Sequence, residues 1–355
     1  MSQKMSIITK KQILILIISL ILIFLSMTKL GRACSRAVYL GKEGQTVTGR
    51  SMDWSEDMKS NLYLFPRGMK KNGGADKNSL EWVSKYGSVI TSVYEGATSD
   101  GMNEKGLVTN LLYLAESKYP DNKSNKPVVY VSAWAQYVLD NYSTVKEAVE
   151  DLRKEKFIVK TATIPNGRSG SVHLAMSDPS GDSAIFEYVD GKLVIHHGKE
   201  FQIMTNSPLY DEQLAIEKYW KEIGSENLLL GTARAADRYV RAAYYINASG
   251  QTSDANEAVA TVASVIRNAS VPRGVINPVS SNLSETIWRT YADQKNKIYF
   301  FEDTAYPSIV WVDLKQLDFT SGTKVRKIQL SGNRNLSGDI TDKFMESKPF
   351  TFIVN

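Results

Sequence analysis

Cys34 is the only cysteine among the 355 residues of the chain. The segment before it is typical of a removable secretory signal, and cleavage after Ala33 would place the cysteine at a new N-terminus. A free α-amino group has a reference pKa of about 7.7–8.0, so a useful fraction of it is unprotonated near neutral pH. This amine could take the proton of the thiol on the same residue, and the sulfur would then be a nucleophile. The spacing therefore predicts an N-terminal nucleophile that needs no base from elsewhere in the chain.

The leader contains the parts that a signal peptidase recognises. Lysines at positions 4, 10 and 11 form a positive region, residues 13–25 are apolar apart from one serine, and Gly31-Arg32-Ala33 places small residues before the cut. The apolar run is shorter than the roughly 20 residues that a membrane span needs, although residues 26–30 could extend it into an uncleaved anchor. We expect residues 1–33 to be removed and the mature chain to be periplasmic or secreted, with no membrane attachment.

Removal of the leader makes the chain electrically neutral. Five of the 43 Lys and Arg residues lie in the leader, which has no acid, so those that remain equal the 38 Asp and Glu residues in number. Without a basic run there is no electrostatic case for a nucleic-acid partner. A single cysteine forms no internal disulfide, and residues 34–355 are enough for one large domain that is stabilised by its core.

Other familiar chemistries lack their motifs. His173, His196 and His197 are the only histidines, and they form no H-E-x-x-H pattern, so we expect ordinary surface or strand-end histidines and no metal. The chain has no G-x-S-x-G elbow, no P-loop and no G-x-G-x-x-G before a helix. We therefore expect no cofactor, and Cys34 is left as the best nucleophile.

A predicted β-hairpin positions this cysteine. The β-prone segments 35–40 and 46–49 flank a short turn, so Cys34 lies at the start of the first strand. Arg50 and Asp53 follow the second strand and are expected near the same end of the hairpin.

Strands and helices alternate in blocks along the rest of the chain. Strand patterns recur at 172–176, 184–189, 192–196, 286–292, 297–302 and 308–314. Helical patterns cover 132–141, 143–153 with Ser143 as the N-cap, 210–220, 235–246 and 254–267. This arrangement favours a layered α+β fold over a doubly wound parallel sheet. The chain shows no internal repeat and no linker that would divide residues 34–355 into two domains.

Six short motifs occur in the order and spacing of the choloylglycine hydrolase family and cover essentially the whole mature chain. They are Cys34-Ser35-Arg36-Ala37-Val38, Gly49-Arg50-Ser51-Met52-Asp53-Trp54, Phe65-Pro66-Arg67-Gly68, Asn103-Glu104-Lys105-Gly106-Leu107, Thr205-Asn206-Ser207-Pro208 and Arg238-Tyr239-Val240-Arg241. The chain thus resembles that family, which comprises bile salt hydrolases and penicillin V acylases. The resemblance implies a four-layer αββα N-terminal nucleophile (Ntn) hydrolase fold and hydrolysis of the C–N bond of a small N-acyl amide.

The resemblance also implies a role for each of five residues. Cys34 matches the nucleophile, and Arg50 resembles the arginine whose charge favours the thiolate. Asp53 resembles the carboxylate that orients the α-amine. Asn206 resembles the side chain that donates to the oxyanion, and Arg238 resembles the second active-site arginine. Each of the four polar residues has an ordinary alternative at a turn, a strand end or a helix surface, so the assignment depends on the whole set.

Three further residues bear on the substrate. Tyr113 occupies the position of the second oxyanion donor, where bile salt hydrolases typically have Asn and penicillin V acylases have Tyr, and its backbone N–H can donate. Met52 and Trp54 are expected to line an apolar pocket that suits phenoxyacetyl, fatty acyl or steroid groups. The chain is most similar to penicillin V acylases of the Gram-negative branch, some of which accept N-acyl homoserine lactones. Conjugated bile salts are the alternative substrate.

The stretch from Asn206 to Arg238 is short compared with Gram-positive members of the family, in which an assembly loop supports a tetramer. A homo-oligomer is therefore an open alternative that the resemblance does not decide.

Two functions of other classes compete with hydrolysis. A cysteine after a signal segment can begin a lipoprotein, whose processing would consume both the sulfur and the amine of Cys34. Gly31 and Arg32 fit that processing poorly, because it favours an aliphatic residue three positions before the cysteine. The second alternative is an inactive relative that only binds a ligand, and the intact set of polar residues argues against it.

Overall fold

Two β-sheets form the centre of this computed structural model, which describes residues 34–354 except 75–76, 124, 225–226, 276–283, 307 and 334. The expected signal peptide, residues 1–33, lies outside the described residues. The first sheet is antiparallel apart from its β17–β19 pair. Its strands, in order across the sheet, are β14 (Ile203–Thr205), β1 (Ser35–Leu40), β2 (Thr46–Trp54), β15 (Glu285–Asp293), β16 (Ile298–Asp303), β17 (Ile309–Asp313) and β19 (Gly338–Asp339).

The second sheet is larger and antiparallel throughout. Its strands, in order, are β13 (Lys192–His197), β12 (Ser183–Val189), β11 (Val172–Ser177), β8 (Val108–Tyr113), β7 (Ala97–Asn103), β6 (Ser88–Val93), β3 (Leu62–Phe65), β18 (Arg326–Ile328) and β20 (Met345–Glu346). Two short pairs lie apart from both sheets: β4 (Lys70–Asn72) with β5 (Glu81–Val83), and β9 (Val128–Tyr130) with β10 (Ile158–Lys160).

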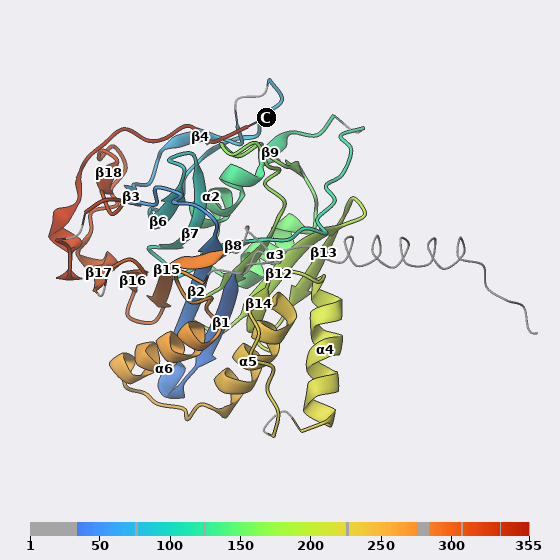
Figure 1. Cartoon of the computed structure of the whole chain (residues 1–355). Helices are drawn as coiled ribbons and strands as arrows, with labels where there is room; N and C mark the ends of the chain where they lie inside the picture. The colour runs from blue at the N-terminus through green and yellow to red at the C-terminus, as the bar shows by residue number, and fades with distance from the viewer. Residues whose placement is uncertain are drawn as a thin grey trace, which may run out of the picture. The chain divides into compact units, whose positions relative to one another are not determined.

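Helices cover the outer face of each sheet. Helices α5 (Ala235–Ala248) and α6 (Ala255–Asn268) lie along β1 and β2, as Figure 1 shows, and α4 (Tyr210–Glu222) packs beside α5. Helix α2 (Val131–Asn141) packs on β7 and β8, and α3 (Val145–Leu152) on β12. Apolar side chains from both sheets share one core cluster between them. The order helix, sheet, sheet, helix confirms the predicted αββα layers.

The helix starts follow from local capping. Asp254 accepts a hydrogen bond from the Glu257 amide at the start of α6. At α3 the N-cap is Thr144, which accepts from the Glu147 amide, so our placement of the cap at Ser143 was wrong by one residue. Ser143 instead donates its amide and hydroxyl to the Glu147 carboxylate, which reaches back over the first turn.

Strand β2 is longer than we predicted, and this changes where the site residues lie. The prediction ended the strand at Gly49, but β2 continues to Trp54, so Arg50 and Asp53 lie within it rather than after it. Strand β15 pairs with it as far as Trp54 and β1 as far as Ser51, and every residue of the strand is buried. The polar run after Gly49 hid the strand, because burial on both sides removes the usual alternation of polar and apolar residues.

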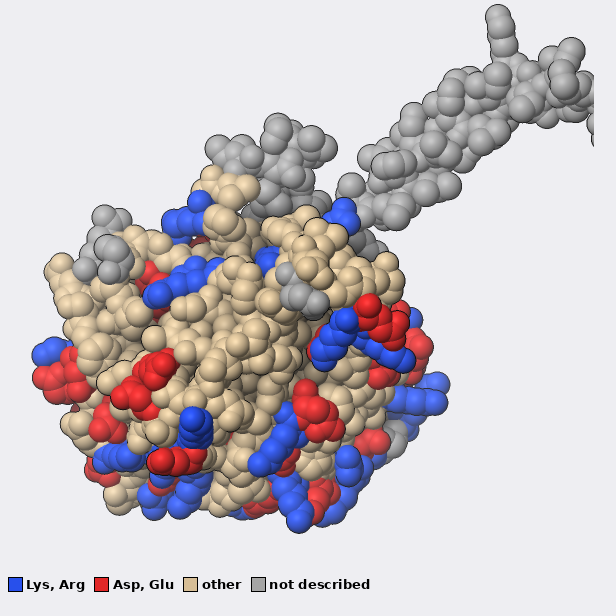
Figure 2. Space-filling view, turned by 90° about the horizontal axis from the view of Figure 1, so that it is seen from below, with Lys and Arg blue, Asp and Glu red and all other residues tan. Residues whose placement is uncertain are grey.

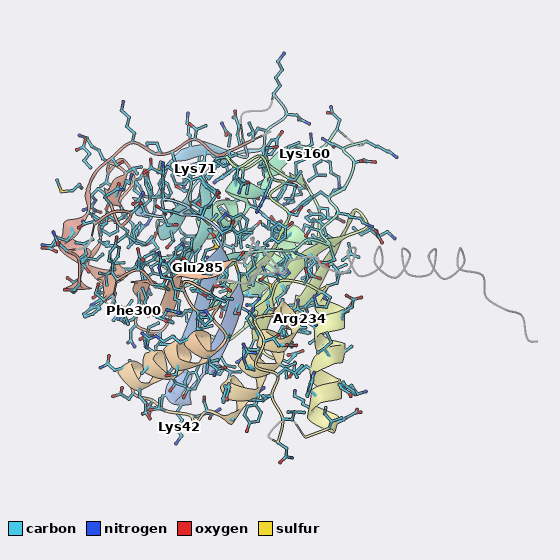
Figure 3. All side chains as sticks on the ribbon, viewed as in Figure 1. Lys42, Lys71, Lys160, Arg234, Glu285 and Phe300 are labelled. Atoms are coloured by element: carbon cyan, nitrogen blue, oxygen red, sulfur yellow. The ribbon has the colours of Figure 1, made fainter. Side chains whose placement is uncertain are left out.

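The central strands of the second sheet were also missed. Strands β6, β7 and β8 lie between residues 88 and 113, where β7 has the sequence ATSDGMN. Apart from β2, the strands that we did predict are present, with end positions shifted by at most one residue. His196 and His197 lie at the end of β13 as expected, but His173 is a buried residue of β11 and not a surface or strand-end residue as expected, although it lies near the start of that strand. Figure 3 shows the two ends of this part of the first sheet. Lys42, at the β1–β2 turn, lies at one end, and Glu285, which is paired with Trp54, lies at the other, where Cys34 is also found.

Among the residues that the structure describes, none of the helices has the length and apolar character needed to cross a membrane.

Candidate active site

Cys34 lies directly before β1 and is buried, with 1% of its surface exposed. Its sulfur is 3.8 Å from the Met52 sulfur and 4.0 Å from the Asp53 carbonyl oxygen. The nearest cationic group among its contacts is Arg50, whose Nη2 lies 4.0 Å from the sulfur. Because β1 and β2 pair antiparallel, the start of one strand meets the end of the other, and the predicted hairpin geometry is confirmed.

Arg50 is held rigidly beside the sulfur. Its Nη2 donates to the Leu111 carbonyl at 2.8 Å, and its guanidinium lies 4.4 Å from the centre of the Trp288 ring. Its Nη1 lies 3.7 Å from the carboxylate of Asp100, a buried residue of β7. Burial raises the pKa of Asp100, and the Arg50 charge opposes that rise. The buried guanidinium therefore places a positive charge beside the sulfur, in a part of the protein that is closed to solvent.

Asp53 is also fully buried. Thr286 donates to its Oδ1 at 2.5 Å, and Arg238 lies 3.6 Å from its Oδ2. Oδ2 has no hydrogen-bond donor among the described residues, although it is shielded from solvent. Burial raises the pKa of Asp53 to about 6, against the opposing charge of Arg238 and the Thr286 hydrogen bond. One carboxylate oxygen is therefore fixed by a hydrogen bond, and the other can accept a hydrogen bond from a further donor.

Arg238, on the buried face of α5, forms hydrogen bonds with the start of β1 and with Asn206. Its Nη1 donates to the Cys34 carbonyl at 2.9 Å and to the Ser35 hydroxyl at 2.5 Å. Its Nη2 donates to Asn206 Oδ1 at 3.3 Å. Burial lowers the pKa of Arg238, and Asp53 opposes that change. The contacts show that Arg238 positions the Cys34 backbone and does not lie on an exposed helix surface.

Asn206 follows β14 and reaches both halves of the site. Its Oδ1 accepts from the Cys34 nitrogen, and its Nδ2 donates to the Tyr113 carbonyl at 2.6 Å. Gln213 of α4 holds the loop, since its Nε2 donates to the Asn206 carbonyl at 2.7 Å and the Pro208 carbonyl at 2.6 Å. Hydrogen bonds with the Cys34 nitrogen, Arg238 and the Tyr113 carbonyl thus fix the orientation of the Asn206 side-chain amide, with Nδ2 directed toward Tyr113.

An apolar pocket opens beside the sulfur. It encloses about 660 Å³ of space outside the protein atoms, a volume that includes its opening to solvent. Its walls come from β2 and the loop after it, the β6–β7 hairpin, β8, the start of α2, the segment 162–172 and one residue near the end of the chain. The lining residues include Cys34, Arg50, Met52, Trp54, Met58, Val93, Tyr94, Leu111, Tyr113, Val131, Ser132, Ile164, Val172 and Ile353.

Aromatic side chains form one side of this apolar pocket. The rings of Trp54 and Tyr113 meet edge to face with centroids 6.2 Å apart. Trp54 Nε1 donates to the Tyr94 hydroxyl at 2.8 Å, and that hydroxyl donates to the Glu56 carboxylate. Asn166 donates to the same carboxylate at 3.0 Å, so a chain of hydrogen bonds fixes the Trp54 ring and links two loops.

The structure brings together all eight site residues that the sequence analysis named. Cys34, Arg50, Asp53, Asn206 and Arg238 form one connected group, which we call the polar cluster. The other three, Met52, Trp54 and Tyr113, line the apolar pocket with Cys34 and Arg50.

Sequence reasoning missed the residues that hold the polar cluster in place. Thr286 fixes Asp53, Asp100 and Trp288 fix Arg50, and Gln213 fixes the Asn206 loop. None of them lies within one of the six motifs, and each is an ordinary residue of a strand or helix. Ser35 accepts a hydrogen bond from Arg238. It is the one such partner that the sequence could have indicated, because it lies next to Cys34 in the first motif.

Comparison with known proteins decides the family. The family model for linear amide C–N hydrolases of the choloylglycine hydrolase type matches residues 34–328. The chain belongs to this family. It is therefore a hydrolase of linear amides, as predicted.

Two relatives share about half of their residues with this family member. It is 47% identical to a penicillin V acylase of Pectobacterium atrosepticum over 90% of this chain and 92% of the relative. A solved penicillin V acylase from Agrobacterium tumefaciens is 50% identical, covers 91% of this chain and 100% of its own, and superposes with a TM-score of 0.84. A conjugated bile acid hydrolase variant from Clostridium perfringens, 22% identical over 86% of this chain and 98% of its own, has a TM-score of 0.72 and shows the shared fold.

Proposed function

We propose that this chain hydrolyses the side-chain amide of penicillin V and similar N-acyl amides, with Cys34 as an N-terminal nucleophile. One observation carries the proposal: the Cys34 sulfur lies where the polar cluster meets an apolar pocket, whose aliphatic and aromatic walls suit an acyl group. The identity to two penicillin V acylases and the presence of Tyr113 support this substrate over conjugated bile salts.

Cleavage of the Ala33–Cys34 bond is the first requirement. It would leave a free amine on Cys34 where there was an amide, and the added hydrogens need acceptors. Asn206 Oδ1 already accepts from this nitrogen, and the unpartnered Asp53 Oδ2 is available as a second acceptor. The family match begins at residue 34, which supports a mature chain from 34 to 355. We propose that residues 1–33 direct export to the periplasm or beyond.

Catalysis then proceeds in two halves. The amine takes the proton from the Cys34 thiol while Arg50 stabilises the thiolate, and the sulfur attacks the amide carbonyl. Asn206 Nδ2 and the Tyr113 backbone N–H stabilise the oxyanion. The Cys34 ammonium gives its proton to the leaving nitrogen as the C–N bond breaks, which leaves a thioester. Water, deprotonated by the same amine, attacks the thioester and releases the acid and the thiol.

The test compares two forms of the chain, one that begins at Cys34 and one that keeps Arg32-Ala33 before it. Each is assayed against penicillin V, N-acyl homoserine lactones and conjugated bile salts. We expect hydrolysis only from the form that begins at Cys34, with penicillin V as the best substrate. Equal rates from both forms would refute the N-terminal nucleophile.

A mass measurement on the native N-terminus separates the hydrolase from the lipoprotein. We expect the mass of an unmodified chain that begins at Cys34. A lipid on Cys34 would add several hundred daltons, would consume both reacting groups and would refute the proposal.

A further inference from the structure

We propose that Ile353 forms the end wall of the apolar pocket and sets the length of the acyl group that the enzyme accepts. The inference rests on the proposed function and adds a residue that determines specificity. Ile353 lies more than 100 residues after the last motif that identifies the family, yet it lines the same pocket as Cys34.

The segment that carries Ile353 is fixed by its backbone. The Ile353 amide donates to the Gly96 carbonyl at 2.8 Å, and the Ser132 hydroxyl donates to the Ile353 carbonyl at 2.6 Å. These bonds join the segment to the turn between β6 and β7 on one side and to the start of α2 on the other. Figure 1 shows the end of the chain reaching the part of the molecule near β4 and β9.

The side chain of Ile353 packs closely against Gly96, which leaves it room at the pocket. A Cβ atom at position 96 would lie 2.5 Å from Ile353 Cγ1, which is far inside van der Waals contact. Glycine is therefore required there for steric reasons, with the side chain of Ile353 occupying the space that a Cβ would take.

The neighbours of Ile353 do not share its position. Val354 lies against Gly74, where a Cβ atom would be 2.7 Å from Val354 Cγ1. Phe352 is buried and meets the Phe350 ring edge to face at 5.5 Å. Neither Phe352 nor Val354 lines the apolar pocket, so the segment presents Ile353 alone to it.

The register of β7 places this wall away from the sulfur. Asp100 pairs with Arg50 next to Cys34, and Gly96 is the turn residue directly before β7, four positions earlier in the chain. The β7 residues Ala97 to Asp100 span at most about 10 Å at roughly 3.3 Å per residue, because the β6–β7 pairing is irregular between Thr91 and Ser92. The apolar pocket therefore runs from the reacting sulfur toward Ile353, and an acyl chain that enters it would meet this side chain at its far end.

The experiment measures binding of acyl chains apart from hydrolysis. Straight-chain carboxylates from butanoate to dodecanoate, together with phenoxyacetate, are titrated by calorimetry into the full chain that carries Cys34→Ala. The same series is titrated into that chain with Ile353→Ala, Ile353→Phe or Val354→Ala added. Val354→Ala is the matched control, because it shortens the adjacent side chain outside the pocket.

We expect Ile353→Ala to raise affinity for the longer acids relative to the shorter ones by about tenfold, as two more methylenes become buried. Ile353→Phe should shift the preference toward shorter acids, and Val354→Ala should leave it unchanged. An identical length preference in all variants, a shift as large in Val354→Ala, or no binding of any acid would overturn the inference. Hydrolysis by the unmutated enzyme tests the proposed function separately, since binding is measured without turnover.

Discussion

The two sides of Cys34 differ in kind. On one side the polar cluster places two arginines, a carboxylate and an amide out of contact with water, each with defined partners. On the other side the apolar pocket offers sulfur, aliphatic and aromatic surface. Buried charges are costly unless they are paired, so the polar cluster tolerates little change, whereas apolar walls tolerate substitution of similar volume. The cluster should therefore govern the rate of the chemical step, and the pocket should govern which acyl group is cleaved.

The charged residues on the surface are arranged differently. In the face drawn in Figure 2, basic and acidic side chains lie next to one another along the lower and right-hand parts, and uncharged residues fill much of the middle. The concentration of charge that matters for catalysis is internal, where low polarity strengthens each interaction.

The largest expected effect comes from the nucleophile. Cys34→Ser should fold normally but lower kcat by about 10⁴-fold or more, because a hydroxyl is a far weaker nucleophile near neutral pH. Circular dichroism provides the folding control. A stoichiometric thiol-alkylating reagent should abolish the activity of the unmutated enzyme in the same assay, and full activity after alkylation would exclude Cys34 as the reacting group.

The next effect tests the oxyanion. Asn206→Ala should lower kcat by roughly 10²–10³-fold and change KM little, because the charge on the oxygen exists only in the transition state. Asn206→Asp keeps an acceptor for the Cys34 nitrogen but removes the Nδ2 donor, so it should lose as much. If Asn206→Asp retained the unmutated rate, the residue would act on the amine alone.

Asp53 should affect the pH profile. A nearby carboxylate favours the charged form of the Cys34 amine and raises its pKa. Asp53→Asn should therefore lower the rate and move the acidic limb of the kcat/KM profile to lower pH, measured from pH 4 to 9. A profile that is only scaled down would make Asp53 a structural residue.

Stability gives a second test of Asp53. Its folded-state pKa of about 6 lies above the ordinary value, so the stability that depends on neutral Asp53 is full below about pH 4 and is lost as pH rises through 6. We compare chains that keep Arg32-Ala33, with and without Asp53→Asn. Between pH 4 and pH 8, the free energy of unfolding of the chain with Asp53, measured with denaturant, should fall by about 3 kcal/mol relative to that of Asp53→Asn. In the chain that begins at Cys34, the ammonium should reduce this difference; an equal difference in both chains would contradict the pairing.

The smallest effect belongs to the apolar pocket. Trp54→Leu removes the edge-to-face contact with Tyr113 and should raise KM for phenoxyacetyl amides by about tenfold, with kcat nearly unchanged. Straight-chain acyl amides serve as the control, because they gain less from an aromatic wall. A fall in kcat as large as that of Asn206→Ala would mean that pocket and cluster are not separable.

Much of the site could be predicted because its chemistry is local. The hairpin follows from β-prone segments around a turn, and it brings Cys34 next to Arg50 and Asp53 without information from the rest of the chain. The helices that carry Arg238 and Gln213 follow from their periodicity. The types of the reacting residues, and the motifs around them, identified the family before any contact was known.

The remainder depended on which strands lie next to each other. The buried polar strand β7 has no apolar alternation, so neither its existence nor the role of Asp100 was predicted. The raised pKa of Asp53 comes from burial, which no sequence pattern reports.

By itself, the sequence determined the candidate nucleophile, the types of its partners and the hairpin that carries it, because covalent neighbours and short-range pairing decide these. Only the tertiary structure decided the shape of the apolar pocket, because its wall combines side chains from segments between Cys34 and Ile353 that meet through sheet packing. Substrate choice depends on that shape, and the volume left between packed elements is a property of the whole fold rather than of any one segment.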